Sequence, residues 1–256
     1  MILGAILAVC FGAIFGSFIN ALIYRVHDRS TLWGRSVCES CSLRIQPRHL
    51  VPIFSWLWLH GRCPHCKRKI HIHHPIVEGL SAIFAGIVFF RHPFIDPAQT
   101  VLFCFEFFFI LNLLFLSAFD WRWKLLPIEW MVASFFLFSL CGMALGLHSV
   151  LSVIIGALFG FGFLGIQTAL SKGTWMGAGD PWLGALIGGT LGWPLIAVSY
   201  YLTYVGGALV VIPFFMMRRI SVRIRLPFAP LLSMGAIGAL WFGDQLVNVI
   251  RHWWGG

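Results

Sequence analysis

The chain contains nine acidic residues among 256, few enough for each to be considered separately. Five lie in or at the edge of long apolar runs, where an ionisable side chain is costly and is by default a candidate for function: Glu78, Glu106, Asp120, Glu129 and Asp180. Asp120 ends one apolar run, and Asp180 begins another. Two carboxyls close together in a low dielectric share a proton, so one can deprotonate a water while the other donates to a scissile carbonyl. This pair indicates aspartic peptidase chemistry.

Two glycines among the three residues before Asp180 support that interpretation. Gly177 and Gly179 let a substrate backbone approach closely and permit unusual dihedral angles. Two structural alternatives stay open. Asp180 is also a candidate helix N-cap, because Pro181 follows at the favoured first helical position. Asp120 is also a candidate solvated helix-end residue, because Arg122 and Lys124 follow it closely.

Four cysteines form a second constellation. Cys38 and Cys41 make one C-x-x-C pair, and Cys63 and Cys66 make another after 21 intervening residues. Two such pairs can supply four thiolates to one tetrahedral Zn²⁺. Basic neighbours would favour the thiolates, and a segment of about fifty residues needs such help to fold, because it cannot easily build its own core. The pattern predicts a structural zinc site, with redox pairs or unpaired thiols as the alternative.

Long apolar segments are the elements that must position these groups. Hydrophobic residues make up 59% of the chain and charged residues 11%, well under the roughly 25% charged of a soluble domain. A helix of about 20 apolar residues crosses the hydrocarbon core of a bilayer. We therefore expect an all-α membrane protein with about eight transmembrane helices. They are placed at 2–23, 75–90, 99–119, 126–146, 149–170, 180–192, 194–217 and 229–249. The sixth is short, and its glycine spacing favours close helix packing.

The distribution of basic residues predicts the orientation of these helices. Net charge is +9, and sixteen of the 18 lysines and arginines fall on one side of the eight spans, nine of them between Arg25 and Lys69. The positive-inside rule places that side in the cytoplasm and both termini outside. Asp120 and Asp180 then lie at similar depth on the cytoplasmic side. This pattern fits membrane topology better than a nucleic-acid surface, so no nucleic-acid partner is expected.

The expected organisation has three parts. Residues 1–24 form the first transmembrane helix, 25–73 a cytoplasmic four-cysteine zinc domain, and 74–256 a helical transmembrane domain that carries the two aspartates.

The order of these motifs resembles that of a known family, the bacterial prepilin peptidases or type IV leader peptidases. The similarity covers nearly the whole chain. An opening motif at residues 16–25 is followed by the two C-x-x-C pairs, by Pro75, Val77 and Glu78, by Asp120 with the later Leu125, Leu126 and Pro127, by the G-x-G-D motif at 177–180, and by a late element at 227–230.

The resemblance implies an activity and its partners. Asp120 and Asp180 would be the catalytic pair of an intramembrane endopeptidase in the bacterial inner membrane. It would remove the basic leader of prepilin or pseudopilin precursors on the cytoplasmic face, just before the apolar stretch of the substrate. Many family members then methylate the new N-terminus with S-adenosylmethionine, and the zinc-type loop is associated with that step. The implied partners are these precursors and membrane lipid.

The chain departs from the family pattern beside both aspartates. Ile128 stands where the family usually has an aspartate after the proline of the first motif, and Trp182 stands where a lysine is frequent. Neither position belongs to the catalytic pair, so peptidase activity is expected to survive, whereas methylation rests on resemblance alone. Two other classes of function stay open: a proton-coupled transporter that uses the intramembrane acids, and a non-enzymatic assembly factor whose zinc loop docks a partner.

Overall fold

The computed structural model describes residues 1–32, 34–38, 40–174, 176–216 and 227–254. Within these ranges the protein is all-helical, and its only strand-like pairings are two isolated bridges. Eight long helices correspond one to one with the expected spans. They are α1 (Ile2–His27), α3 (His73–Arg91), α4 (Pro97–Trp123), α5 (Ile128–Ala144), α6 (Val150–Leu170), α7 (Asp180–Leu191), α8 (Leu195–Met216) and α9 (Ala229–Trp254).

Four of these helices are long and apolar enough to cross a membrane: α1, α3, α4 and α6. Helix α5 and the stretch 195–209 of α8 are apolar but shorter. At 12 residues, α7 spans only about 18 Å, less than the roughly 30 Å of a hydrocarbon core. The basic residues expected between 218 and 225, and the last residue of the span expected at 194–217, lie outside the described residues.

The chain divides into two compact units, Met1–Ala118 and Phe119–Gly256, with the boundary inside α4. The division expected from the sequence, at residues 24 and 73, separates membrane from soluble segments rather than compact bodies, and it stays a prediction.

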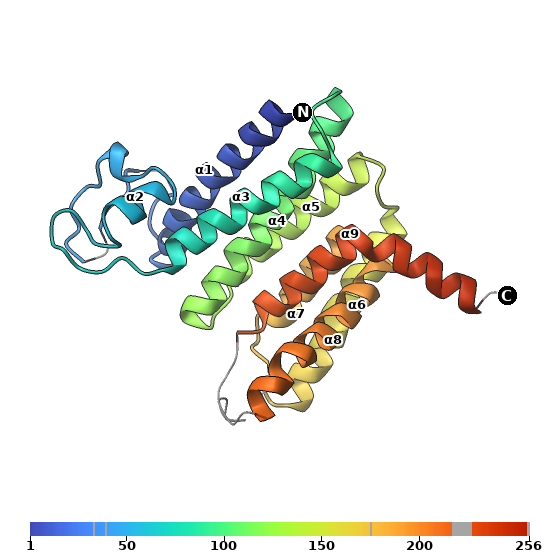
Figure 1. The fold of residues 1–256 in the computed structure, drawn as a ribbon. Coiled ribbons are helices and arrows are strands. Elements are labelled where there is room, and N and C mark those ends of the chain that lie inside the picture. The colour runs from blue at the N-terminus through green and yellow to red at the C-terminus, as the bar shows by residue number, and fades with distance from the viewer. Residues whose placement is uncertain (33, 39, 175, 217–226, 255–256) are drawn as a thin grey trace. The chain divides into compact units, whose positions relative to one another are not determined.

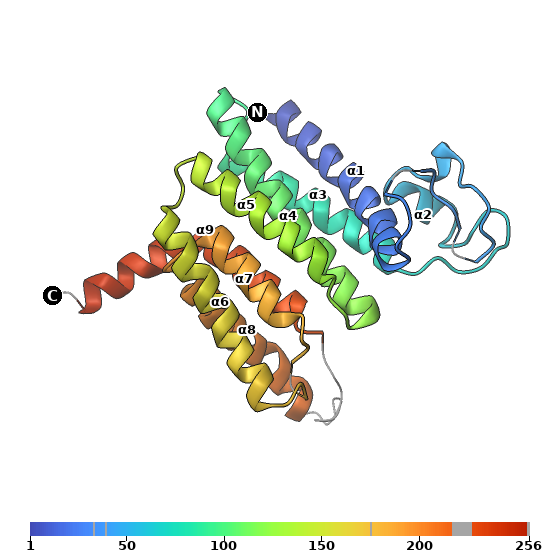
Figure 2. The same ribbon diagram turned by 180° about the vertical axis from the view of Figure 1, so that it is seen from behind.

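The first unit is built on the pairing of α1 with α3, which lie side by side in Figures 1 and 2. Small residues allow the close approach: a Cβ at Gly12 or Gly16 would overlap backbone atoms of Ser81 or Glu78. The hydroxyl of Ser81 donates a 2.5 Å hydrogen bond to the Gly12 carbonyl. Between α1 and α3 the chain forms the four-cysteine segment, which contains the one-turn 3-10 helix η1 (Pro47–His49) and the short helix α2 (Phe54–Trp58).

The second unit is organised around α7, which contacts α5, α6, α8 and α9 (Figure 1). Ten of the twelve residues of α7 are buried. Glycines make this possible, because a Cβ at Gly184 or Gly188 would overlap the carbonyls of Gly160 or Gly156 on α6. The close packing expected from the glycine spacing is therefore present, and its consequence is a fixed position for the first residue of α7, Asp180.

Candidate active site and metal centre

Asp120 lies one turn before the end of α4 and is buried, with 7% of its surface exposed. Its Oδ2 accepts a 3.0 Å hydrogen bond from the backbone N–H of Ala229, the first residue of α9. The N-terminus of a helix carries unpaired N–H groups and a partial positive charge, so it is a natural seat for a carboxylate. The alternative of a solvated helix-end residue is therefore wrong for Asp120.

Asp180 is the first residue of α7 and is also buried, with 5% exposed. Its Oδ2 accepts a 2.7 Å hydrogen bond from the N–H of Gly177, three residues before it. The N-cap of α7 is Gly179, and no side chain caps this helix. The alternative of Asp180 as an N-cap is therefore wrong: its carboxylate turns back onto the G-x-G loop instead of onto its own helix.

The two aspartate motifs touch one another through Gly179 and Leu126. A Cβ added to Gly179 would lie 2.8 Å from the Cβ of Leu126, in the segment that links α4 to α5. The charge of Asp120 also acts on the Asp180 carboxyl. The two acids thus share one electrostatic environment. The backbone N–H of Phe228 also donates to the Asp120 carboxyl.

Two tyrosines of α8 line the same region, and sequence reasoning missed them. The hydroxyl of Tyr200 donates a 2.6 Å hydrogen bond to the Gly160 carbonyl, and that of Tyr204 donates a 2.7 Å bond to Oε1 of Gln167. The charge of Asp180 acts on both rings. The available signal was compositional: three of the four tyrosines of the chain fall within five residues of one apolar helix, where a hydroxyl needs a partner.

The four predicted zinc ligands come together in the first unit. The Sγ atoms of Cys38, Cys41, Cys63 and Cys66 all lie within 4.8 Å of one another. Those of Cys38 and Cys66 are 3.9 Å apart. Zn–S bonds of about 2.3 Å in a tetrahedron place sulfurs about 3.8 Å apart, so the observed spacing fits the metal. A disulfide needs sulfurs near 2.05 Å.

Two turns of the same geometry present these cysteines. The N–H of Cys38 donates to the carbonyl of Leu43, and the N–H of Cys63 donates to that of Arg68. In each turn the acceptor lies five residues after the first cysteine of the pair. The residue after each second cysteine has positive φ, 56° at Ser42 and 58° at Lys67. Repetition of one turn at both pairs indicates a metal site rather than four unrelated thiols.

The protonation of two of these thiols bears on metal binding. Burial raises the pKa of the Cys63 thiol, but the backbone N–H groups of Cys66 and His65 donate to it and lower the pKa to about 7. The N–H of Leu43 lowers the pKa of the Cys41 thiol, whereas burial and the neighbouring cysteines raise it to about 11. A bound cation must therefore displace protons, as zinc does at thiolate sites.

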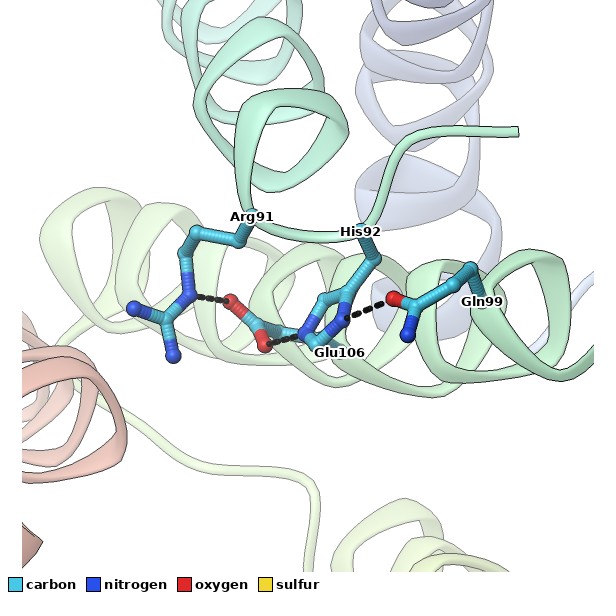
Figure 3. Close-up of polar contacts among 4 residues, drawn as sticks. All are labelled: Arg91, His92, Gln99 and Glu106. Atoms are coloured by element: carbon cyan, nitrogen blue, oxygen red, sulfur yellow. Dashed lines mark hydrogen bonds and ion pairs between the residues drawn. The ribbon is translucent and has the colours of Figure 1, made fainter. Parts of the chain in front are cut away.

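The three other acids of the apolar segments lie in different surroundings. Figure 3 shows Glu106 between Arg91 and His92: the Nε of Arg91 lies 3.0 Å from Oε1, and the Nε2 of His92 lies 2.9 Å from Oε2. Gln99 completes this group at 3.2 Å from the other ring nitrogen of His92. Glu78 accepts a 2.7 Å bond from the N–H of Ile53, and Glu129 is exposed at the start of α5. Among the five acids, the paired arrangement belongs to the aspartates.

Comparison with known proteins agrees with this arrangement. The profile of the Bacterial Peptidase A24 N-terminal domain matches residues 10–92, and that of the Type IV leader peptidase family matches residues 107–212. A protein of Bacillus subtilis named "Prepilin leader peptidase/N-methyltransferase" is 32% identical over 244 residues, which cover 93% of this chain and 94% of that protein. The chain belongs to the type IV leader peptidase family.

Other members of this family carry the same name. The Pseudomonas putida relative is 29% identical over 94% of this chain and 91% of its own length. The Pseudomonas aeruginosa relative is 26% identical over the same shares of the two chains. No solved structure matches the chain. The type IV leader peptidase match spans both aspartates, and the N-terminal match spans all four cysteines.

Proposed function

We propose that this protein is an aspartic endopeptidase of the bacterial inner membrane that removes the leader peptide from prepilin or pseudopilin precursors. The observation that carries the proposal is the pair of buried aspartates, both anchored by backbone N–H groups, in two motifs that touch where Gly179 meets Leu126. Membership of the type IV leader peptidase family and the names of its relatives supply the substrate class.

The chemistry follows from the way the two carboxyls are held. Neighbouring carboxyls share one proton because both cannot ionise easily in a low dielectric. In the resting enzyme one aspartate is ionised and takes a proton from the attacking water, while the other donates its proton to the scissile carbonyl. The backbone N–H groups that bond to Oδ2 fix both carboxyls in place.

Eight membrane crossings, with both aspartates and the four-cysteine segment on the cytoplasmic face, complete the proposal. Support comes from the eight long helices and from the sixteen of 18 basic residues on one side of them. Helix α7 is too short to cross the core alone, so it reaches only part of the way and relies on the four helices around it. Its buried surroundings would keep lipid away from Asp180.

The proposed enzyme would use two cofactors, zinc and a methyl donor. Cys38, Cys41, Cys63 and Cys66 would hold a structural Zn²⁺, which closes the two turns into one module. Methylation of the new N-terminus is extended to this chain from the relatives' name. The described residues contain no Gly-rich turn between a strand and a helix.

The proposed function is tested by the products that the protein forms from a prepilin. The chain is co-expressed with a prepilin in cells that lack their own leader peptidase, and the pilin is analysed by mass spectrometry. The expected result is removal of the basic leader just before the apolar stretch, with a methyl group on the new N-terminal amine. Cleavage without methylation would leave a peptidase alone. An uncut precursor in the presence of correctly inserted protein would refute the proposal.

A further inference from the structure

A pocket of about 300 Å³ lies in the first unit, between α1 and the loop that precedes α2. We call it the α1 pocket. Its α1 wall includes Ile14, Phe18, Ala21 and Arg25, and its loop wall includes Ser36 and Pro52. It lies in a different compact unit from Asp120 and Asp180, and neither the peptidase chemistry nor the zinc site uses it.

The loop wall of the α1 pocket is fixed from two sides. Arg25 donates hydrogen bonds of 2.5 Å to the Leu32 carbonyl and 2.8 Å to the Gly34 carbonyl, which folds the loop back over the helix. Because a guanidinium has five N–H donors, these two bonds leave donors and the full positive charge available.

The second attachment is a strained turn. Ile53 has φ +62° and ψ −53°, and the N–H of Phe54 bonds the Pro52 carbonyl at 2.6 Å. This is a γ-turn with positive φ, a rare conformation that is especially unfavourable for a β-branched residue. The buried carboxyl of Glu78, on α3, holds it by accepting the N–H of Ile53 at 2.7 Å. Because Glu78 holds this turn in place, the loop wall has its shape before any ligand binds. Strained backbone of this kind is frequent at functional sites.

The position of the α1 pocket along α1 defines the kind of ligand it fits. From Ile14 to Arg25 it covers twelve residues, about 16 Å of helix. Ile14 lies near the middle of α1, and Phe18 is 48% exposed, so the inner end is apolar and open at membrane depth. Arg25 lies at the other end, in the last turn of α1. An amphiphile with one charged end matches this polarity.

Charge decides between amphiphiles. The segment from Arg25 to Lys69 holds nine basic residues against two acidic ones, Asp28 and Glu39. Asp28 is next to His27, whose Nδ1 lies 2.9 Å from its carboxylate. This excess of positive charge attracts anions and repels the basic leader of a prepilin, so the leader is a poor occupant.

We propose that the α1 pocket binds one anionic phospholipid, with an acyl chain along Ile14, Phe18 and Ala21 and the phosphate at Arg25 and Ser36. The proposal rests on α1 crossing the membrane, which is part of the proposed function. A bound lipid of this kind would tie the four-cysteine segment to the membrane surface. This role is independent of the chemistry at the aspartates.

Lipid titration of the full-length protein in detergent, followed by native mass spectrometry, tests the proposal. Phosphatidylglycerol and phosphatidylcholine with the same acyl chains are compared. One basic residue near a lipid headgroup contributes about 1 kcal/mol, so phosphatidylglycerol should bind about fivefold more tightly. Arg25→Gln should abolish this preference, whereas Arg25→Lys should keep most of it. Inorganic phosphate should not displace the lipid.

A steric variant separates the pocket from general binding to the basic loop. Ala21→Trp fills the α1 pocket and should lower the affinity for both lipids at least tenfold. Ala5→Trp is the control, since Ala5 is a half-buried alanine of the same helix outside the pocket. If Ala21→Trp does not fold, the comparison of the two lipids on the native protein still decides.

Three results would overturn the proposal: equal affinity for the two lipids, equal binding by the Ala21→Trp and Ala5→Trp variants, or displacement of the lipid by phosphate. The measurement is repeated on Asp180→Asn, which should bind lipid as the native protein does. Lipid binding and peptidase activity can therefore fail separately.

Discussion

The backbone N–H of Ala229 donates a hydrogen bond to Oδ2 of Asp120 across 109 residues of chain. This bond joins the end of α4 to the start of α9 and places the carboxyl at a helix N-terminus, where negative charge is stabilised. Asp180 is anchored in the same manner by Gly177. Both acids are thus held in position by backbone N–H groups.

Replacement of Ala229 by proline removes one of the two backbone N–H groups that hold Asp120, and that of Phe228 remains. Proline is tolerated at the first position of a helix, so α9 should still form. A hydrogen bond to a charged group contributes about 1.5–3 kcal/mol, and prepilin cleavage should fall about ten- to a hundredfold. Val150→Pro is the matched control, since Val150 is the exposed first residue of α6. Equal activity of the two variants would show that the anchor does not matter.

Gly179→Ala and Gly177→Ala should differ although both change the G-x-G loop. A Cβ at Gly179 would lie 2.8 Å from Leu126, tighter than real side chains allow, and would push apart the segments that bring the aspartates together. A Cβ at Gly177 meets its nearest neighbour at 3.6 Å, an ordinary contact. Cleavage assays should therefore show a loss of tenfold or more for Gly179→Ala and a small change for Gly177→Ala. The opposite order would contradict the geometry.

The helices themselves were largely predictable from the sequence. Continuous apolar runs indicated where the eight long helices begin and end to within a few residues, except that α1 and α4 extend four residues and α9 five residues beyond the expected ends. Helix α4 continues past Asp120 through Trp121, Arg122 and Trp123. Helix α2 was not predicted, since five residues carry no periodic pattern.

The contacts that build the site were less predictable. Asp120 and Asp180 could be singled out because acids are rare in apolar runs. The four cysteines could be assigned to a zinc site because two C-x-x-C pairs are typical of one. The partner of Asp120 could not be found this way, since a backbone N–H 109 residues away leaves no trace in residue types. The γ-turn at Ile53, held by Glu78, is likewise a tertiary feature that overrides the local preference of isoleucine.

Removal of one predicted zinc ligand should release the metal without stopping the chemistry at the aspartates. Metal analysis of the purified protein should give about one Zn²⁺ per chain, and Cys38→Ser should lose it. Cys10→Ser, an exposed thiol of α1, is the control and should keep it. Because carboxylates need no metal to activate water, a chelator that leaves the fold intact should leave cleavage intact. Strong inhibition under those conditions would contradict a metal-free reaction.

Zinc binding should release protons, and its affinity should fall as the pH falls. At pH 7 the Cys41 thiol, with a pKa of about 11, is protonated, and the Cys63 thiol, with a pKa of about 7, is half ionised. Both groups should therefore release protons when zinc binds, because the metal binds thiolates. Calorimetry in buffers of different ionisation enthalpy measures this release. Binding without proton release would contradict thiolate ligation by these residues.

Cleavage of a purified prepilin by Asp120→Asn and Asp180→Asn tests the central claim, the catalytic pair, most directly. Asparagine keeps the size of the side chain but cannot exchange a proton with water or the scissile carbonyl. Each variant should lose about 10²- to 10⁴-fold in rate while its thermal stability stays near that of the native protein. Glu129→Gln, at an exposed acid of α5, should remain active. Full cleavage by either aspartate variant would contradict the account.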